Sequence, residues 1–329
     1  MSWLAGIDIG GTKCAVCLGR QEGETVEICW KEKFPTPSDP HEAVARLVDG
    51  LAALLNAHPE VRLEAVGVSC GGPLDSKTGL ILCPPNLPNW DRIDVVHPFE
   101  ERFGVPAAVQ NDANACALAE WLWGAGRGSE NMIFLTFGTG LGAGLILDGR
   151  LCSGACDMAG EAGHIRLAED GPVGYGKRGS FEGFCSGGGV GRHAAALAKE
   201  WIAEGKETLL VPPGHTPDEI TAALVGEAAA KGDALALRVW EETGRKLGRG
   251  LAILIDLINP ERIVIGSIFL RQEALLRGPM EEEIAKEALS YSAAACRVVP
   301  AGLGEAIGDY AALSVAGNLL RTRGEQESL

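Results

Sequence analysis

Two glycine- and threonine-rich segments, each set between short apolar runs, constrain the fold of this chain more than any other feature. The first reads Asp8-Ile-Gly-Gly-Thr-Lys13 and the second reads Thr136-Phe-Gly-Thr-Gly-Leu-Gly142. Strand-like runs lie before and after each, so both are predicted to be strand–turn–strand units. Glycine lets the backbone approach a bound group closely, while threonine hydroxyls and turn N–H groups donate to phosphate oxygens. The pair predicts two backbone cradles for one polyphosphate, as in a nucleotide-using enzyme.

Composition narrows the class of protein further. A chain of 329 residues is long for one hydrophobic core, which predicts two domains. A net charge of -15 argues against a nucleic-acid partner, because such binding needs a basic face. No apolar run is long enough to cross a bilayer, and the N-terminus enters a strand without a basic-then-apolar leader. We therefore expect a cytoplasmic protein with no membrane partner.

The ten cysteines are scattered among apolar neighbours, without two pairs at the spacing of a zinc finger. This distribution favours reduced thiols, as in a cytoplasmic protein, over a disulfide framework.

The remaining pattern predicts an α/β chain. Antiparallel strands are expected in residues 1–30, and the segment 150–190 is rich in glycine, which is typical of a binding loop or lid. Gly244, Gly248 and Gly250 lie in one helical run and predict close helix packing. Helices are predicted at 41–57, 113–124, 194–203, 221–231, 235–258, 281–288 and 309–320, and further strands at 65–70, 106–111 and 262–266. Hairpins joined to strand–helix units predict mixed sheets in two lobes.

Five segments in order resemble the ROK family of sugar kinases and related repressors: Asp8–Lys13, Gly71-Gly-Pro73, Asn111-Asp-Ala-Asn-Ala115, Thr136-Phe-Gly-Thr-Gly140 and Gly160-Glu-Ala-Gly-His164. The match runs from residue 4 to about residue 316. The resemblance implies the actin-like ATPase (ribonuclease H-like) α/β fold, with two lobes of mixed sheets around a central cleft. The lobes would comprise residues 1–115 plus 311–329 and residues 116–310, and a homodimer is expected.

The resemblance also assigns the reacting groups of a phosphoryl transfer. Asp112 would be the catalytic base that takes the proton of a sugar 6-hydroxyl, with Asn111 bonded to a neighbouring hydroxyl. The alternative for Asp112 is a helix cap. Asp8 would hold Mg²⁺ through water, because an unpaired carboxylate at the end of a buried strand is costly. The alternative for Asp8 is a hydrogen bond to the following turn.

Two sets of residues are expected around the nucleotide and the sugar. ATP would be held by the two turns and by a later glycine, a set comprising Asp8, Gly10, Gly11, Thr12, Lys13, Thr136, Gly138, Thr139, Gly140 and Gly266. Lys13 either adds positive charge or is a solvated strand residue. The hexose would be bound by Asn86, Asn111, Asp112, Glu161, His164 and Glu182, with Trp90 beside Asn86.

Two departures from the family pattern change the expected site. Many members carry a cysteine zinc site soon after the histidine, whereas this chain reads Val173-Gly-Tyr-Gly-Lys-Arg-Gly-Ser180. Valine cannot bind zinc, so no zinc is predicted, and Tyr175 and Phe181 are expected to hold the loop by packing. In addition, Gly266-Ser-Ile-Phe269 replaces a run of glycines near the adenosine, which predicts an altered nucleoside pocket or a different phosphate donor.

The sequence therefore predicts a Mg²⁺- and ATP-dependent hexose kinase acting at the 6-hydroxyl, with glucokinase as the leading assignment. Mannose, fructose, allose and N-acetylhexosamines stay open as acceptors, because they differ by one hydroxyl or one substituent. A transcription repressor would need an N-terminal helix-turn-helix, and the first turn begins at residue 8. A sugar-binding or regulatory member without catalytic activity is the remaining alternative.

Overall fold

The computed structural model describes residues 1–327, which form two compact units. The first unit contains Met1–Glu130, Gly144–Ala159 and the chain from Gly302 onward; the second contains Asn131–Ala143 and Gly160–Ala301. These bounds differ from the predicted lobes of 1–115 plus 311–329 and 116–310. The reason is that the helix after residue 111 packs on the C-terminal helix of the first unit. No helix among residues 1–327 is long and apolar enough to cross a membrane.

The first unit is a mixed five-stranded sheet of order β3-β2-β1-β4-β8, next to a small sheet of order β5-β6-β7. The strand β1 pairs antiparallel with β2 and parallel with β4, so the predicted mixed sheet is confirmed. The elements of this unit are β1 (Ser2–Ile9), β2 (Lys13–Glu22), β3 (Thr25–Pro35), α1 (Pro40–Ala57), β4 (Leu63–Cys70), β5 (Leu74–Asp75), β6 (Leu80–Leu82), β7 (Asp91–Asp94), α2 (His97–Phe103), β8 (Ala107–Asn111), α3 (Asp112–Trp123), β11 (Arg150–Leu151), η3 (Gly304–Ala306) and α10 (Ile307–Glu327).

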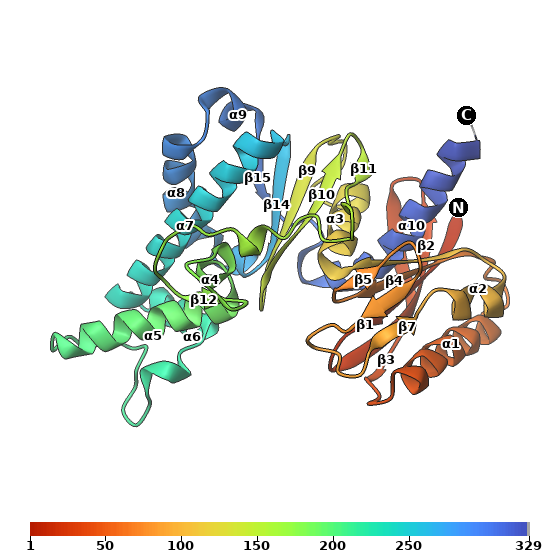
Figure 1. Ribbon diagram of the computed structural model, residues 1–329, viewed down its shortest axis with the longest axis horizontal. Coiled ribbons are helices and arrows are strands. Elements are labelled where there is room, and N and C mark those ends of the chain that lie inside the picture. Colours follow the sequence, from red (N-terminus) through yellow and green to blue (C-terminus); the bar gives the residue numbers. More distant parts are fainter. Residues whose placement is uncertain (328–329) are drawn as a thin grey trace. The chain divides into compact units, whose positions relative to one another are not determined.

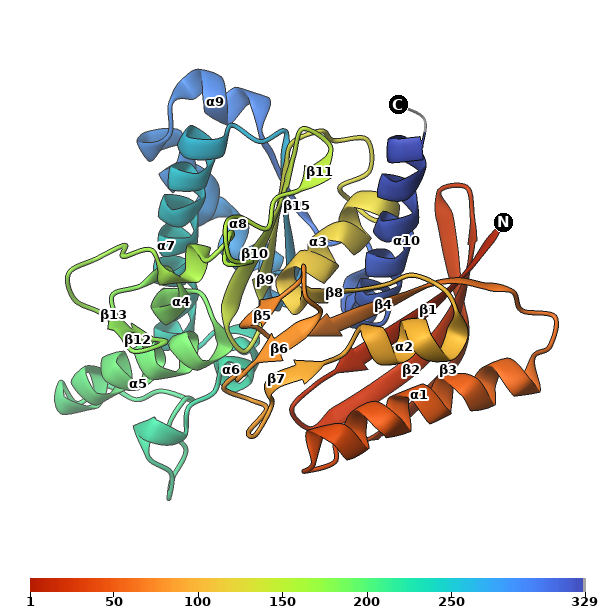
Figure 2. The same ribbon diagram turned by 45° about the vertical axis from the view of Figure 1, so that its right-hand side comes forward.

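Alternation along β1 explains why this sheet is covered on both faces. Ile7 and Ile9 pack with apolar residues of α1, including Leu47, whereas Leu4 packs with Leu313 of α10. Successive side chains of a strand point to opposite faces, so a strand buried on both sides reads as a nearly continuous apolar run. Figures 1 and 2 show α1 and α10 on opposite sides of the sheet.

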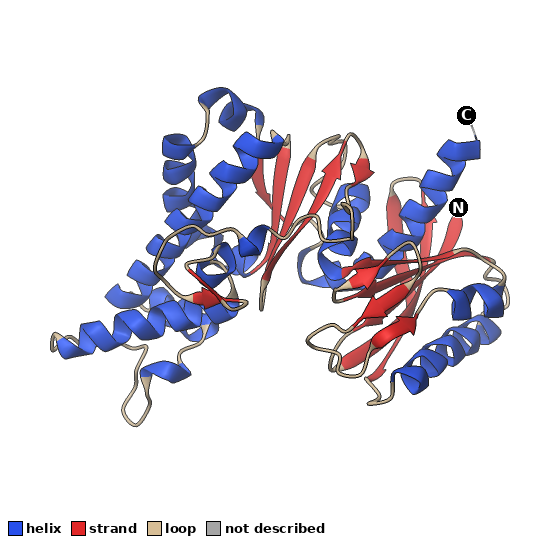
Figure 3. Ribbon diagram, in the orientation of Figure 1, coloured by secondary structure: helices blue, strands red, loops and turns tan. Residues whose placement is uncertain are grey.

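The second unit surrounds a sheet of order β11-β10-β9-β14-β15, in which β14 pairs parallel with both β9 and β15. The boundary between the units falls within β10. The elements are β9 (Met132–Phe137), β10 (Leu141–Leu147), η1 (Ala162–His164), β12 (Val173–Gly174), β13 (Lys177–Arg178), α4 (Phe181–Phe184), α5 (Gly187–Ala203), η2 (Pro217–Glu219), α6 (Ala222–Ala230), α7 (Ala234–Ile258), β14 (Arg262–Ser267), α8 (Ile268–Glu287), α9 (Ser290–Ala295) and β15 (Arg297–Pro300). Figure 3 shows that helices make up most of this unit.

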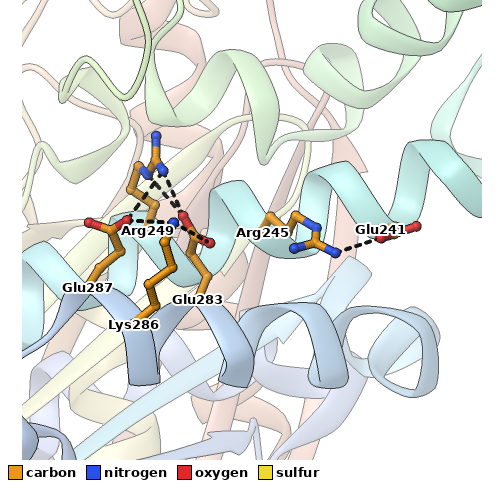
Figure 4. Close-up of polar contacts among 6 residues, drawn as sticks. All are labelled: Glu241, Arg245, Arg249, Glu283, Lys286 and Glu287. Atoms are coloured by element: carbon orange, nitrogen blue, oxygen red, sulfur yellow. Dashed lines mark hydrogen bonds and ion pairs between the residues drawn. The ribbon is translucent and has the colours of Figure 1, made fainter.

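The helix pair α7 and α8 confirms the close packing predicted from glycines. A side chain at Gly248 would overlap the carbonyl oxygen of Met280 in α8, and one at Gly244 would lie only 2.9 Å from the carbonyl oxygen of Leu276 in the same helix. Gly250 packs instead against the ring of Phe181 in α4. Ion pairs add to the contact, since Arg249 of α7 bonds Glu283 of α8 at 2.8 Å between Nη2 and Oε1 and also lies 3.5 Å from Glu287 Oε1 (Figure 4). Backbone proximity and apolar burial, more than exposed charges, hold the pair together.

Several local predictions need correction. The segment 150–190 contains short strands and helical turns, and the helix predicted to begin at residue 194 starts at Gly187. Tyr175 is 74% exposed and does not pack the loop, whereas Phe181 is fully buried as expected. Trp90 is only 1% exposed and belongs to the core of the first unit, so it offers no open stacking face. The helix predicted at 281–288 is the end of the longer α8, which has non-helical backbone angles at Gln272.

Candidate active site

The first glycine turn is a compact loop between β1 and β2. The Gly10 N–H donates to the Lys13 carbonyl at 3.1 Å, and the Thr36 hydroxyl donates to the Gly10 carbonyl at 2.6 Å. Gly11, Thr12 and Lys13 are exposed. Position 11 requires glycine because the backbone of Asn86 lies so close that a Cβ at position 11 would overlap the Asn86 carbonyl oxygen. The turn thus places the backbone of Asn86 beside the predicted phosphate donors of the first unit.

Asp8 ends β1 directly before this turn and is partly buried. No group among residues 1–327 hydrogen-bonds its carboxylate, so the hydrogen bond to the turn considered above is not formed. The pKa of Asp8 is raised to about 6, chiefly by loss of solvation; Lys31 opposes the rise, while Asp309 and Asp112 add to it. A partly buried carboxylate without a hydrogen-bonding partner is suited to a cation that replaces its lost hydration.

Asn111 and Asp112 lie at the junction of β8 and α3, where Asn111 caps the helix and Asp112 does not. Asn111 is the N-cap of α3, and its Oδ1 accepts from the Asn114 N–H at 2.7 Å. Asp112 is the next residue and is exposed, with Oδ1 accepting from the adjacent Ala113 N–H at 2.8 Å. The cap is therefore Asn111 rather than Asp112. Although Asp112 is exposed, protein atoms around its carboxylate remove part of the solvation, and this loss raises its pKa. The hydrogen bond from the Ala113 N–H opposes the rise.

The second glycine turn joins β9 to β10 in the second unit. The Gly138 N–H donates to the Gly140 carbonyl at 3.0 Å, and Thr139 is exposed at the tip. The Glu182 carboxylate accepts from the Leu141 N–H at 3.1 Å, so this residue also fixes the end of the turn. The Gly187 N–H donates to the Gly138 carbonyl at 2.7 Å, which joins the turn to the start of α5.

A cavity of about 600 Å³ opens beside this turn, entirely within the second unit. Backbone at its edge comes from Gly138 and from Gly187 at the start of α5, while Ser267 and Ile268 come from the start of α8. Arg192 and Arg271 add two guanidinium groups. Gly266 is buried beside the ring of Phe134, and its neighbour Ser267 lines the cavity instead. Glycine backbone, hydroxyls and cations around a cavity of this size suit an anionic ligand with an organic part.

The remaining predicted sugar residues lie near the short helix η1 of the second unit. Glu161 is the N-cap of this helix and His164 is its last residue, and both are exposed. The His164 ring lies edge-on to Tyr175 with centroids 6.4 Å apart. The His164 carbonyl accepts from Lys177 at 2.7 Å. Asn86 is exposed in the first unit. The second unit thus brings Glu161 and His164 together, and the first brings Asn86 close to Gly11.

The segment expected to lack zinc forms the small hairpin of β12 and β13. Among residues 1–327 no group of three or more histidine, cysteine or acidic side chains is placed to hold a metal ion. The ten cysteines are unpaired; Cys83 and Cys156 are exposed, while others such as Cys17 and Cys185 are buried. The absence of zinc stays a prediction, whereas the donor set of this hairpin offers a zinc ion no thiolate.

The start of α5 was not identified from the sequence, nor were the two arginines, Arg192 and Arg271, that line the cavity. The signal was present in Ser186-Gly-Gly-Gly189, a serine cap followed by glycines before an apolar helical pattern. Ser186 caps the helix by accepting from the Gly189 N–H at 3.0 Å. Arg192 and Arg271 lie 79 positions apart in the numbering and carry no local signal of a shared site.

Comparison with known proteins agrees with this architecture. The glucokinase of Streptomyces coelicolor is 33% identical over 283 residues, which is 86% of this chain and 87% of that protein. A ROK family glucokinase from Streptomyces griseus, solved with glucose and AMPPNP, superposes with a TM-score of 0.72 at 31% identity, covering 96% of this chain and 100% of the other. A ROK family transcriptional regulator, a homologue of the E. coli MLC protein, gives a TM-score of 0.80 at 26% identity, covering 95% of this chain and 77% of the other.

Two units of mixed sheets with glycine turns at strand ends define an α/β protein of the actin-like ATPase fold, as predicted. The ROK family model matches residues 4–317, and this chain belongs to the ROK family. Its relatives include sugar kinases and transcriptional regulators.

Proposed function

We propose that this protein is a Mg²⁺- and ATP-dependent hexose kinase that phosphorylates the 6-hydroxyl, with glucose as its preferred acceptor. The observation that carries the proposal is the division of roles between Asn111 and Asp112. Because Asn111 caps α3, the Asp112 carboxylate is not used as the cap; it is exposed and accepts from its neighbour's N–H at 2.8 Å. A base is most effective when its pKa approaches the working pH, which a raised pKa favours.

The proton and bond changes follow from that arrangement. The 6-hydroxyl oxygen attacks the γ-phosphorus of ATP while Asp112 takes the hydroxyl proton, and ADP leaves with the electrons of the broken P–O bond. Asn111 uses its Oδ1 for the cap, so its amide nitrogen donates to a neighbouring hydroxyl. Glu161, His164 and Glu182 would bond the other sugar hydroxyls, and Asn86 would contact the sugar from the first unit.

Asp8 is the residue that would hold Mg²⁺, through water. Its carboxylate is partly buried, and no group within residues 1–327 hydrogen-bonds it. When bound, the ion would neutralise charge on the phosphate oxygens of ATP. The residues Gly10, Gly11, Thr12 and Lys13 would donate to the phosphates from the first unit.

The cavity of the second unit is proposed to take the nucleotide. Thr136, Gly138, Thr139 and Gly140 would donate to phosphate oxygens at its edge. The altered segment from Gly266 to Phe269 does not fill the cavity, because Phe269 is fully buried and only Ser267 and Ile268 line the space. The relative from Streptomyces griseus, solved with AMPPNP, supports ATP as the donor.

Glucose is favoured because relatives at 33% identity, from Streptomyces coelicolor and Halalkalibacterium halodurans, are glucokinases. Repressors also belong to this set of relatives, at 29% identity for a xylose repressor of Caldicellulosiruptor bescii, of whose length the match covers 65%. The exposed Asp112 and both glycine turns favour the kinase. A cytoplasmic homodimer is part of the same proposal, and light scattering of the purified protein would show twice the mass of one chain.

A coupled assay over a panel of hexoses tests the proposed function. ATP and Mg²⁺ would be supplied with glucose, mannose, fructose, allose or an N-acetylhexosamine, and ADP release would be followed. We expect kcat/KM to be highest for glucose, and EDTA to abolish turnover. ADP release that does not depend on any of these hexoses would contradict the proposal.

A further inference from the structure

The hairpin of β12 and β13 is fastened to the segment that directly follows His164. The Leu167 N–H donates to the Gly179 carbonyl at 2.8 Å. The Phe181 N–H donates to the Ile165 carbonyl, also at 2.8 Å. All of these residues belong to the second unit. Backbone hydrogen bonds therefore fix the base of the hairpin beside the short helix η1, which ends at His164.

The hairpin also packs on Glu182, another residue assigned to the hexose. A Cβ built on Gly174 would overlap the Gly183 nitrogen and would lie 2.8 Å from the Glu182 carbonyl carbon. The Ser180 hydroxyl donates to the Gly174 carbonyl at 3.3 Å. The strand β12 thus lies directly against the backbone of α4, which carries Glu182.

The tip of the hairpin reaches His164 itself. The Lys177 Nζ donates to the His164 carbonyl at 2.7 Å. The Tyr175 ring lies edge-on to the imidazole, with centroids 6.4 Å apart, which is a favourable arrangement for two aromatic rings. One contact acts on the backbone of His164 and the other on its ring, so together they restrict where the imidazole points.

Neither the turn nor the core explains a tyrosine at position 175. Tyr175 and Gly176 are the two residues that join β12 to β13, and their φ angles are 44° and 75°. A two-residue turn with positive φ at both positions favours asparagine followed by glycine, and a bulky side chain is unfavourable at such an angle. Tyr175 is also 74% exposed, so apolar burial does not hold it. What tyrosine provides here and asparagine would not is the ring contact with His164.

We propose that Tyr175 and Lys177 are positioning residues of the acceptor site, which hold the His164 imidazole in the orientation that binds a hexose hydroxyl. The inference rests on the proposed function and adds two residues to it. The hairpin offers zinc no thiolate, so protein contacts are the means by which its own residues can hold His164. An imidazole that is already held loses less rotational freedom on binding, which makes acceptor binding tighter.

Three substitutions separate the contacts with His164 from the stability of the hairpin. Tyr175→Asn removes the ring but suits the turn, whereas Tyr175→Phe keeps the ring. Lys177→Met removes the donor to the His164 carbonyl. Arg178→Met is the matched control, because Arg178 is the exposed neighbour of Lys177 and bonds Arg166 through its carbonyl rather than its side chain. Calorimetry measures the Kd for glucose, steady-state kinetics measure kcat and both KM values, and thermal unfolding without ligand measures stability.

Tyr175→Asn should weaken glucose binding by about three- to tenfold, which is the scale of one aromatic pair, without lowering the unfolding midpoint. Lys177→Met should weaken it by about tenfold, the scale of one hydrogen bond to a charged group. Both should leave kcat and the KM for ATP within about twofold of the wild type, because the groups that react are untouched. Tyr175→Phe and Arg178→Met should bind glucose like the wild type.

Three results would overturn the inference while the proposed function stands. The first is a glucose Kd within about twofold of the wild type in both Tyr175→Asn and Lys177→Met. The second is an equal loss of binding in Arg178→Met, and the third is a lowered unfolding midpoint in Tyr175→Asn. A wild-type protein that turns over none of the hexoses would instead overturn the proposed function, and the role of the hairpin with it.

Discussion

The two glycine turns have similar sequences and different surroundings. The first follows a carboxylate, Asp8, and is packed so tightly that Gly11 touches the backbone of Asn86. The second is surrounded by hydroxyls, those of Thr136, Thr139 and Ser267, and opens on a cavity. Both are strand–turn–strand units, so their sequence patterns alone do not distinguish them.

This difference indicates that the units contribute different chemistry. Acidic side chains of the first unit, Asp8 and Asp112, have raised pKa values and suit metal binding and proton transfer. Hydroxyls and two arginines of the second unit suit the anionic donor. The glycines shared by both turns provide close approach, and the neighbouring side chains decide what each turn does.

Replacing Asp8 with Asn should produce the largest contrast between the two regions. We expect turnover with Mg²⁺ to fall at least 100-fold, because the ion loses its carboxylate, while binding of a non-hydrolysable ATP analogue in the second unit changes less. Stability should move the opposite way and rise by about 1–2 kcal/mol at pH 7.5, since a carboxylate with a raised pKa is costly when charged. Urea unfolding and steady-state kinetics measure the two effects. Lowered stability together with full turnover would contradict this role.

The pH dependence follows from the same two carboxylates. Asp8 has a pKa of about 6 in the folded chain and an ordinary value of 3.8, so the folded state holds the extra proton between these values. Its contribution to stability is therefore greatest below about pH 4 and is lost as the pH rises through 6. Turnover should show the reverse, with kcat/KM falling about tenfold per pH unit below 6 as Asp8 is protonated. Loss of solvation also raises the pKa of Asp112, so its protonation acts in the same direction. A flat profile from pH 7 to 5 would exclude Asp8 from the reaction.

A pair of glycine substitutions tests the difference in packing directly. A methyl group at Gly11 overlaps the Asn86 carbonyl, whereas at Gly138 it meets the hydroxyls of Thr136 and Ser267 no closer than 3.4 Å. Gly11→Ala should therefore cost about 1–3 kcal/mol of unfolding free energy, and Gly138→Ala less than about 0.5 kcal/mol. Chemical denaturation of the two variants measures this. Equal losses would show that the two turns are packed alike.

The smallest effect is expected far from both turns, on the exposed ion pairs of α7 (Figure 4). Arg245 bonds Glu241 at 2.7 Å between Nη2 and Oε1, and both side chains are about half exposed. Arg245→Ala should change the unfolding free energy by less than about 0.5 kcal/mol and should leave KM for both substrates unchanged. A larger loss would mean that this exposed pair within α7 contributes more to stability than an exposed ion pair normally does.

Much of the fold could be predicted from local pattern. Apolar runs beside Gly10 and Gly138 identified the strands of both turns, and glycines in α7 predicted close helix packing without naming the partner helices. The short elements between 150 and 190 could not be predicted, because two-residue strands carry too few positions for periodicity. Trp90 shows another limit: a tryptophan in a proline-rich loop reads as accessible, and only the tertiary packing of the first unit buries it.

The places of Asp8 and Asp112 could be predicted from residue type and a local turn: Asp8 lies directly before the first turn and Asp112 at the start of α3, while their roles stay predictions. Residues whose place in the cavity depends on a backbone angle, or on a neighbour far away in the sequence, could not be predicted. Ser267 has an unremarkable sequence context, and its φ of 59° is set by the junction of β14 and α8. Arg192 and Arg271 share a cavity only because α5 and α8 start at the same end of the second unit's sheet.

The most direct test of the central claim is phosphoryl transfer by an Asp112→Asn variant under single-turnover conditions. Glucose 6-phosphate formed from labelled ATP would be quantified, and glucose binding would be measured separately by calorimetry. If Asp112 is the base, the transfer rate should fall by about 10²–10⁴-fold while the Kd for glucose stays within a few-fold of the wild type. A variant that transfers phosphate within tenfold of the wild-type rate would contradict the assignment.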